Sequence, residues 1–127
     1  MGLTRVEAVV ASPRSPRRRA TMAFLVDSGA AYSVIPAAEL RKLGIRPTEE
    51  RTFFLANGQL VKRKIGEARF TFEGQSATCV VLFGEEGDHA LLGVTTLENL
   101  GLIFDPLRQK ILPLPMMLAE MRRLLTE

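Results

Sequence analysis

The chain has 127 residues and a mass of 14.0 kDa, which suits one domain with a hydrophobic core. Its hydrophobic content of 46% and charged content of 24% are typical of a folded domain and argue against extensive disorder. No apolar run is long enough for a transmembrane helix, and the N-terminal residues lack the pattern of a secretory signal. We therefore expect a cytoplasmic protein that does not associate with a membrane.

The supply of reactive side chains narrows the possible chemistry. The chain has one cysteine, Cys79, and one histidine, His89, so a disulfide within the chain and a zinc site built on cysteines or on two histidines are excluded. His89 lies in a glycine-rich, acidic stretch and is most simply a solvated loop residue. Only three of the 14 acidic residues are aspartates, namely Asp27, Asp88 and Asp105.

The net charge of +3 comes from one short segment. Arg14 and Arg17–Arg19 supply four of the 17 basic residues, and without them 13 basic residues face 14 acidic ones. The body of the domain therefore does not predict nucleic-acid binding. One alternative is a nucleic-acid accessory protein that binds through this arginine loop, and it predicts binding that weakens steeply with salt. A solvated loop tip is the simpler interpretation.

Short apolar or alternating runs, separated by Gly, Pro, Asn and Asp, predict a mostly β domain. In chain order, strands are expected over residues 3–10, 21–26, 31–35, 52–56, 59–73, 77–83, 90–92, 102–104 and 110–114. The long run 59–73 is expected to break near Gly66. Short helices are expected over residues 37–43 and 95–100, closed by Gly44 and Gly101, and an amphipathic helix over residues 116–125. Residues 1–115 would then form the domain and residues 116–127 a C-terminal helical extension.

Three segments could carry chemistry. Asp27-Ser28-Gly29 places a carboxylate at the end of an apolar strand, where burial is unfavourable unless the group is hydrogen-bonded, paired or protonated. By itself this triplet is most simply a tight turn that satisfies its own backbone. Asn57-Gly58 predicts a two-residue hairpin turn, either an ordinary surface turn or a mobile flap over a cleft. Leu91-Leu92-Gly93 by itself predicts only a core strand.

Together and in this order, these segments resemble the retropepsin-like aspartic proteases, the single-domain relatives of pepsin. The likeness is closest to the small prokaryotic members. The matching residues are Leu25–Ala30, the Asn57-Gly58 hairpin, and Leu91-Leu92-Gly93 followed by the expected helix 95–100. The resemblance covers roughly residues 3–115. It implies an all-β fold, a mostly antiparallel closed barrel of the acid-protease type with one or two short helices.

The resemblance implies an aspartic endopeptidase in which Asp27 is the catalytic acid and base. Such a reaction holds a water between two carboxylates that share one proton. Asp88 and Asp105 lack the Asp-Ser/Thr-Gly context, so one chain offers a single catalytic carboxylate and activity requires a homodimer. A peptide substrate in extended form and no metal or cofactor are implied. The remaining implied site residues are Ser28, Gly29 and Ala30 in the active-site loop, Leu91, Leu92 and Gly93 as its support, and Ala56, Asn57, Gly58 and Gln59 at the flap tip.

The sequence also departs from the family pattern. The flap tip contains less glycine and isoleucine than the flaps of retroviral enzymes, and residues 116–127 continue where those enzymes end in a dimer-forming strand. The alternative function is a catalytically silent module of the same fold that dimerises or binds peptides. The intact Asp27-Ser28-Gly29 argues against this alternative, because a binding module has no need to bring two carboxylates together.

Overall fold

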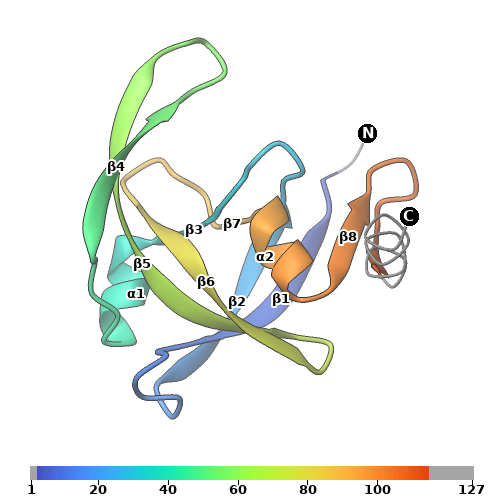
Figure 1. The fold of residues 1–127 in the computed structure, drawn as a ribbon, viewed down its shortest axis with the longest axis horizontal. Helices are drawn as coiled ribbons and strands as arrows, with labels where there is room; N and C mark the ends of the chain where they lie inside the picture. Colours follow the sequence, from blue (N-terminus) through green and yellow to red (C-terminus); the bar gives the residue numbers. More distant parts are fainter. Residues whose placement is uncertain (1–2, 115–127) are drawn as a thin grey trace, which may run out of the picture.

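A computed structural model describes residues 3–114 of the chain, so the helix expected over residues 116–125 lies outside the described residues. The described part contains all eleven other expected elements in the expected order (Figure 1). The strands are β1 (Arg5–Ala11), β2 (Arg19–Val26), β3 (Ser33–Pro36), β4 (Glu49–Phe54), β5 (Leu60–Phe72), β6 (Gln75–Gly84), β7 (Leu91–Leu92), β8 (Leu102–Asp105) and β9 (Lys110–Pro113). The helices are α1 (Ala37–Lys42) and α2 (Val94–Asn99).

Six strands close into a ring. The order β1-β2-β7-β3-β6-β5 returns to its start because the far end of β5 pairs with β1, with Val10 opposite Phe70. The pairings β2–β7 and β3–β6 are parallel, and the other pairings in the ring are antiparallel. β4 adds to the outer edge of β5, and β8 and β9 form a separate two-stranded sheet. The expected closed, mostly antiparallel barrel with two short helices is therefore confirmed.

The length of β5 explains how the ring closes. Its 13 residues pair with β4 at one end, with β6 from Ile65 to Phe72, and with β1 from Arg69 to Thr71. The expected break near Gly66 is wrong, because the strand runs through this residue without interruption. A Cβ at this position would lie 3.0 Å from the carbonyl oxygen of Arg46 and 3.0 Å from the ring of Phe83. The glycine is therefore needed for close packing rather than for a bend.

The core fills the inside of the ring and the spaces under the two helices. Phe24 of β2 and Phe70 of β5 meet with ring centroids 6.1 Å apart, and both are almost fully buried. Leu40 of α1 and Leu97 of α2 are also buried, so each short helix covers one part of the barrel with a single anchoring leucine. Each such side chain contributes about 1.5–3 kcal/mol relative to exposure.

The turns follow the expected residues, with one correction. Gly44 and Gly101 have φ of +76° and +75° and close α1 and α2 as expected. The hairpin at Asn57-Gly58 is not a two-residue turn. The N–H of Gly58 donates to the carbonyl of Leu55 at 2.9 Å, and within this hairpin loop only Gly58 has a positive φ. This is a three-residue loop, in which glycine takes the left-handed position after a tight turn.

Candidate active site

Asp27 lies at the point where two parallel strands end together. β2 and β7 pair with Leu25 opposite Leu91 and Val26 opposite Leu92. The backbone N–H of Asp27 continues this ladder and donates to the carbonyl of Leu92 at 3.1 Å. The carboxyl ends of parallel strands share one edge of a sheet, so the chain delivers this side chain to the rim of the barrel.

The two-residue strand β7 passes between the two strands that the Asp27 loop connects. It pairs with β2 on one side and with β3 on the other, where Val34 faces Leu91. The strand ends at Gly93, which is fully covered by the loop. A Cβ on Gly93 would lie 2.5 Å and 2.6 Å from the carbonyl carbon and oxygen of Tyr32. Only glycine lets the loop backbone approach this closely.

Buried hydrogen bonds hold the loop from below. The hydroxyl of Ser33 accepts the N–H of Gly93 at 2.9 Å and shares a 2.6 Å hydrogen bond with the hydroxyl of Thr96. Both side chains are almost fully buried. The first N–H groups of a helix have no partner inside the helix. Those of α2 donate instead to the loop, from Val94 N to Ala30 O at 2.9 Å and from Thr95 N to Ala31 O at 3.0 Å.

The carboxylate of Asp27 is half-buried and sparsely bonded. Its Oδ1 accepts the N–H of Gly29 at 2.9 Å, and the backbone carbonyl of Asp27 accepts the N–H of Ala30 at 3.1 Å. Ser28 and Gly29 are exposed at the rim. Within the described part of the chain, Oδ2 of Asp27 makes no hydrogen bond, so this oxygen is available to a water, a substrate or another carboxyl group.

The other two aspartates have structural contacts. Asp88 accepts a hydrogen bond from Arg63 at 3.0 Å and from the N–H of Glu85 at 2.8 Å. Asp105 accepts the N–H groups of Leu107 and Arg108 in the β8–β9 turn at 3.0 Å and 3.3 Å. Each of the two also lies beside a cation, with Arg63 Nε 3.0 Å from Asp88 Oδ2 and Arg108 Nε 3.7 Å from Asp105 Oδ2, so Asp27 is the aspartate without a basic partner among the described residues.

A cleft of about 400 Å³ opens beside the Asp27 loop. One wall is the loop itself and the other is the β4–β5 hairpin, whose end, residues 53–61, we call the flap. Tyr32 of the loop and Phe53 of the flap meet edge to face, with ring centroids 6.3 Å apart. The remaining apolar lining includes Val34, Val61, Leu82 and Leu91. An apolar groove of this kind suits a side chain of an extended peptide.

The flap projects away from the barrel (Figure 1). Its tip, Ala56–Gln59, is exposed, and the N–H of Gln59 donates to Asn57 Oδ1 at 2.9 Å. Phe54 is 80% exposed and Leu60 is 56% exposed, which is unusual for side chains of this size. The flap thus has a hydrogen-bonded turn and presents apolar groups to its surroundings.

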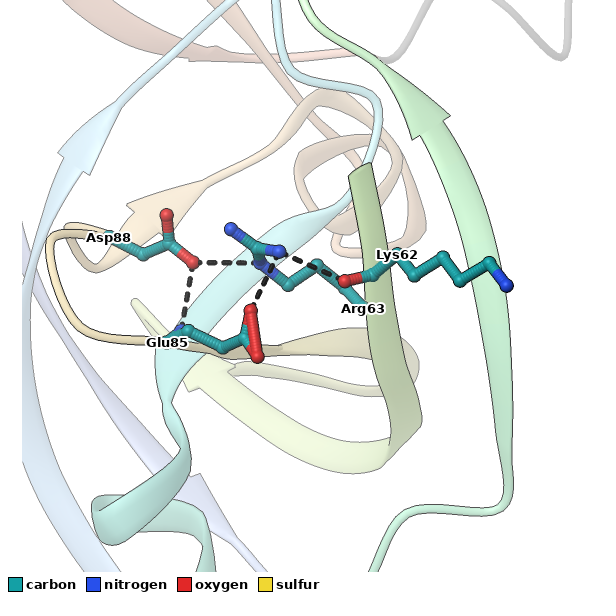
Figure 2. Close-up of polar contacts among 4 residues, drawn as sticks. All are labelled: Lys62, Arg63, Glu85 and Asp88. Atoms are coloured by element: carbon teal, nitrogen blue, oxygen red, sulfur yellow. Dashed lines mark hydrogen bonds and ion pairs between the residues drawn. The ribbon is translucent and has the colours of Figure 1, made fainter. Parts of the chain in front are cut away.

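A charged cluster joins the base of the flap to the β6–β7 loop (Figure 2). Arg63 of β5 donates from Nε to Asp88 Oδ2 at 3.0 Å, and its Nη1 lies 2.7 Å from Glu85 Oε2. Nη1 also donates to the carbonyl of Lys62 at 2.9 Å. Burial alone would raise the pKa of Asp88, but the hydrogen bonds from Arg63 and Glu85 and nearby positive charge outweigh it and lower this pKa. The bond to Asp88 raises the pKa of Arg63.

Sequence reasoning found the loop, its support strand and the flap, but it missed the residues that connect them. Ser33 and Thr96 are 63 positions apart, and Arg63 and Asp88 are 25 apart. The available signal was weak: an arginine on an alternating strand, and a serine at the start of an apolar one. Tyr32 of the loop also lines the cleft.

The arginine loop lies at the other end of the barrel from the flap (Figure 1). Arg14 and Arg46 border a separate cavity of about 430 Å³ there. His89 is exposed at the edge of the cleft. Among residues 3–114, no three His, Cys, Asp or Glu side chains come together as metal ligands, and no helix has the length and hydropathy to span a membrane.

An apolar strand that ends in Asp27-Ser28-Gly29, a two-residue strand inserted beside it and a flap over the cleft define the class of single-domain aspartic proteases. Residues 18–99 match the model of a family described as gag-polyprotein putative aspartyl protease, and this match covers more than half of the chain. The chain therefore belongs to this family of retropepsin-like aspartic proteases. It shares its fold with a retropepsin-like aspartic protease from Rickettsia conorii, with a TM-score of 0.53 and 21% identity over 82% of this chain and 77% of that chain. A comparison with curated proteins finds no match.

Proposed function

We propose that the protein is an aspartic endopeptidase that is active as a homodimer. The observation that supports this most directly is the state of the three aspartates. Asp88 and Asp105 are paired with arginines, whereas Asp27 has no basic partner among the described residues and begins the loop whose residues 29–32 line an apolar cleft. One available carboxylate cannot both activate a water and protonate a carbonyl oxygen, so a second chain must supply the partner.

In the proposed mechanism, two Asp27 carboxyl groups face each other across a two-fold axis and share one proton, because two like charges at that distance do not both ionise. The ionised carboxylate takes a proton from the water that lies between them. The protonated one donates a hydrogen bond to the carbonyl oxygen of the scissile peptide. The reaction as proposed needs no metal or cofactor.

The neighbouring residues would position this chemistry. The exposed hydroxyl of Ser28 would bond to the partner's loop, and the backbone of Gly29 and Ala30 would lie along the substrate. Leu91, Leu92 and Gly93 would support the loop from below. The substrate would lie in extended form under the flap tip, Ala56–Gln59, and pair with backbone groups as an added strand.

The test compares Asp27→Asn with wild type in the digestion of a diverse peptide mixture, read by mass spectrometry over a range of protein concentrations. Asp105→Asn is the matched control, because an asparagine Oδ1 can still accept both N–H groups of its turn. We expect cleavage by wild type and the control, none by Asp27→Asn, and a rate per chain that falls on dilution.

Equal cleavage by Asp27→Asn would contradict the mechanism. Cleavage that is strictly proportional to concentration down to a measured monomer would contradict the shared dyad. Absence of cleavage together with saturable peptide binding would instead favour the catalytically silent binding module of the same fold.

A further inference from the structure

The structure connects the flap to the Asp27 loop through the charged cluster of Arg63, Glu85 and Asp88 (Figure 2). Arg63 lies on β5 just past the flap, opposite Arg51 of β4. Glu85 and Asp88 lie in the loop that leads into β7. The guanidinium group bonds to both acids at once, at 2.7 Å and 3.0 Å, and its side chain is only 20% exposed.

The β6–β7 loop orients the carboxylate of Asp88 through its own backbone. The N–H of Asp88 donates to the carbonyl of Glu85 at 2.9 Å, and the N–H of Glu85 donates back to Asp88 Oδ2 at 2.8 Å. Gly87 supplies the positive φ of +91° that this tight loop requires. A carboxylate that is already oriented loses little freedom on binding a guanidinium group, so the pair fixes geometry as well as charge.

A continuous set of contacts leads from this pair to the catalytic loop. Asp88 and Arg63 both line the cleft, and two residues after His89 the chain enters β7 at Leu91. The carbonyl of Leu92 in β7 accepts the N–H of Asp27 at 3.1 Å. The flap base and the Asp27 loop are therefore attached to the same short segment, residues 85–92.

We propose that Arg63 and Asp88 are positioning residues that fix the base of the flap relative to Asp27 and thereby set the width of the peptide cleft. The proposal rests on the proposed peptidase function. It concerns how the substrate is held, since neither side chain is assigned a role in the chemical step. The effect should therefore fall mainly on KM and on the motion of the flap, with a smaller effect on kcat.

The β4–β5 hairpin also provides a matched control. Arg51 of β4 pairs with Glu49 at 2.7 Å, but both side chains are largely exposed, at 43% and 51%, and both acid and base belong to the same strand. Such a pair is screened by water and connects nothing across the cleft. Arg51→Met thus removes a charge and an ion pair from the β4–β5 hairpin but leaves the contact between this hairpin and the β6–β7 loop intact.

The experiment compares Arg63→Met, Asp88→Asn and Arg51→Met with wild type in two measurements. Hydrogen exchange by mass spectrometry follows the flap amides, such as that of Leu55, which donates to Gln59 O at 2.8 Å. We expect Arg63→Met to speed this exchange about tenfold, with β1 and β2 unchanged. Asp88→Asn should speed it less, because an asparagine oxygen can still accept both hydrogen bonds but no longer carries the charge that pairs with Arg63. Peptide cleavage should show KM raised by about fivefold or more with a smaller change in kcat. Arg63→Lys keeps the positive charge but lacks the planar guanidinium group that bonds to two acids at once, so its exchange rate and KM should lie between those of wild type and Arg63→Met.

Each result bears on a separate claim. Flap exchange equal to that of Arg51→Met would overturn the proposal, and so would faster exchange spread evenly over the whole barrel, which would indicate a general loss of stability. A loss confined to kcat would also overturn it. If wild type cleaves nothing, the proposed function fails, and the exchange of the flap amides still decides whether Arg63 and Asp88 anchor the flap.

Discussion

The hydrogen bonds beneath the Asp27 loop allow a quantitative prediction for Ser33→Ala. The substitution removes one hydroxyl and leaves two buried groups without a partner, the N–H of Gly93 and the hydroxyl of Thr96. An unsatisfied buried polar group costs about 1–3 kcal/mol, so the two groups together predict a loss of about 2–6 kcal/mol in the free energy of unfolding. A domain of this size loses about 3–6 °C in Tm per kcal/mol, which predicts a fall of about 6 °C or more.

The partner substitution separates a network effect from a simple loss of packing. Thr96→Val keeps the volume and leaves Ser33 bonded to Gly93, so it should cost about 1 kcal/mol. In the double variant only the N–H of Gly93 lacks its partner, and the total loss should be smaller than the sum of the single losses by about 1–2 kcal/mol. Urea unfolding followed by circular dichroism measures all four proteins.

An exposed hydroxyl pair in the same barrel serves as the control. Thr71 and Ser76 share a 2.7 Å hydrogen bond across β5 and β6 but lie at the surface. Ser76→Ala should change stability by less than about 0.5 kcal/mol, because water replaces the lost partner. Additive losses for Ser33 and Thr96, or a loss for Ser33→Ala no larger than that of the control, would refute the reasoning.

Two further predictions concern the same end of the barrel. Gly93→Ala should destabilise the protein by about 1–3 kcal/mol or more and raise the protease sensitivity of the Asp27 loop, because its Cβ would meet Tyr32 backbone at 2.5 Å; wild-type behaviour in limited proteolysis would contradict this. The second concerns Asp88, which faces Arg63, Glu85 and His89 and has a pKa below its ordinary 3.8. A lowered carboxyl pKa contributes stability that is present above the ordinary value and lost as the pH falls through the lowered one. The stability difference between wild type and Asp88→Asn should therefore be constant above about pH 5 and shrink below about pH 3.8, and a difference that persists unchanged in stronger acid would exclude the ionised pair as its source.

The order of elements could be predicted from the sequence because the signals for it are local. Alternation on β5 places Ala68 and Phe70 inside, and Gly44 ends α1 where it was expected. Of the two errors, the turn at Asn57-Gly58 differs by one residue within the hairpin itself, whereas the error at Gly66 depended on distant atoms. Gly66 looks like a strand break until Phe83 and the Arg46 carbonyl are placed beside it.

The site was predictable only in part for the same reason. Asp27 could be proposed from its own neighbours, since a carboxylate at the end of an apolar strand is uncommon. The resemblance then gave the support strand and flap their predicted roles, which stay predictions. Nothing near Ser33 or Arg63 in the sequence reveals a partner, because their contacts form only when the ring closes and brings β3 to α2 and β5 to the β6–β7 loop. Side-chain pairs of this kind follow from tertiary structure rather than from pattern.

The Asp27 loop is well supplied with hydrogen bonds, whereas the flap leaves large apolar side chains exposed. This difference supports a partner over this end of the molecule. β7 and α2 hold the Asp27 loop through backbone hydrogen bonds to Asp27, Ala30 and Ala31. The flap instead leaves Phe54 at 80% and Leu60 at 56% exposure. Burying one such side chain contributes about 1.5–3 kcal/mol, so the arm gains stability only when a substrate or a second chain covers it. The proposed homodimer would explain both features, because it supplies a second Asp27 carboxyl group and places the flap against a substrate or a second chain.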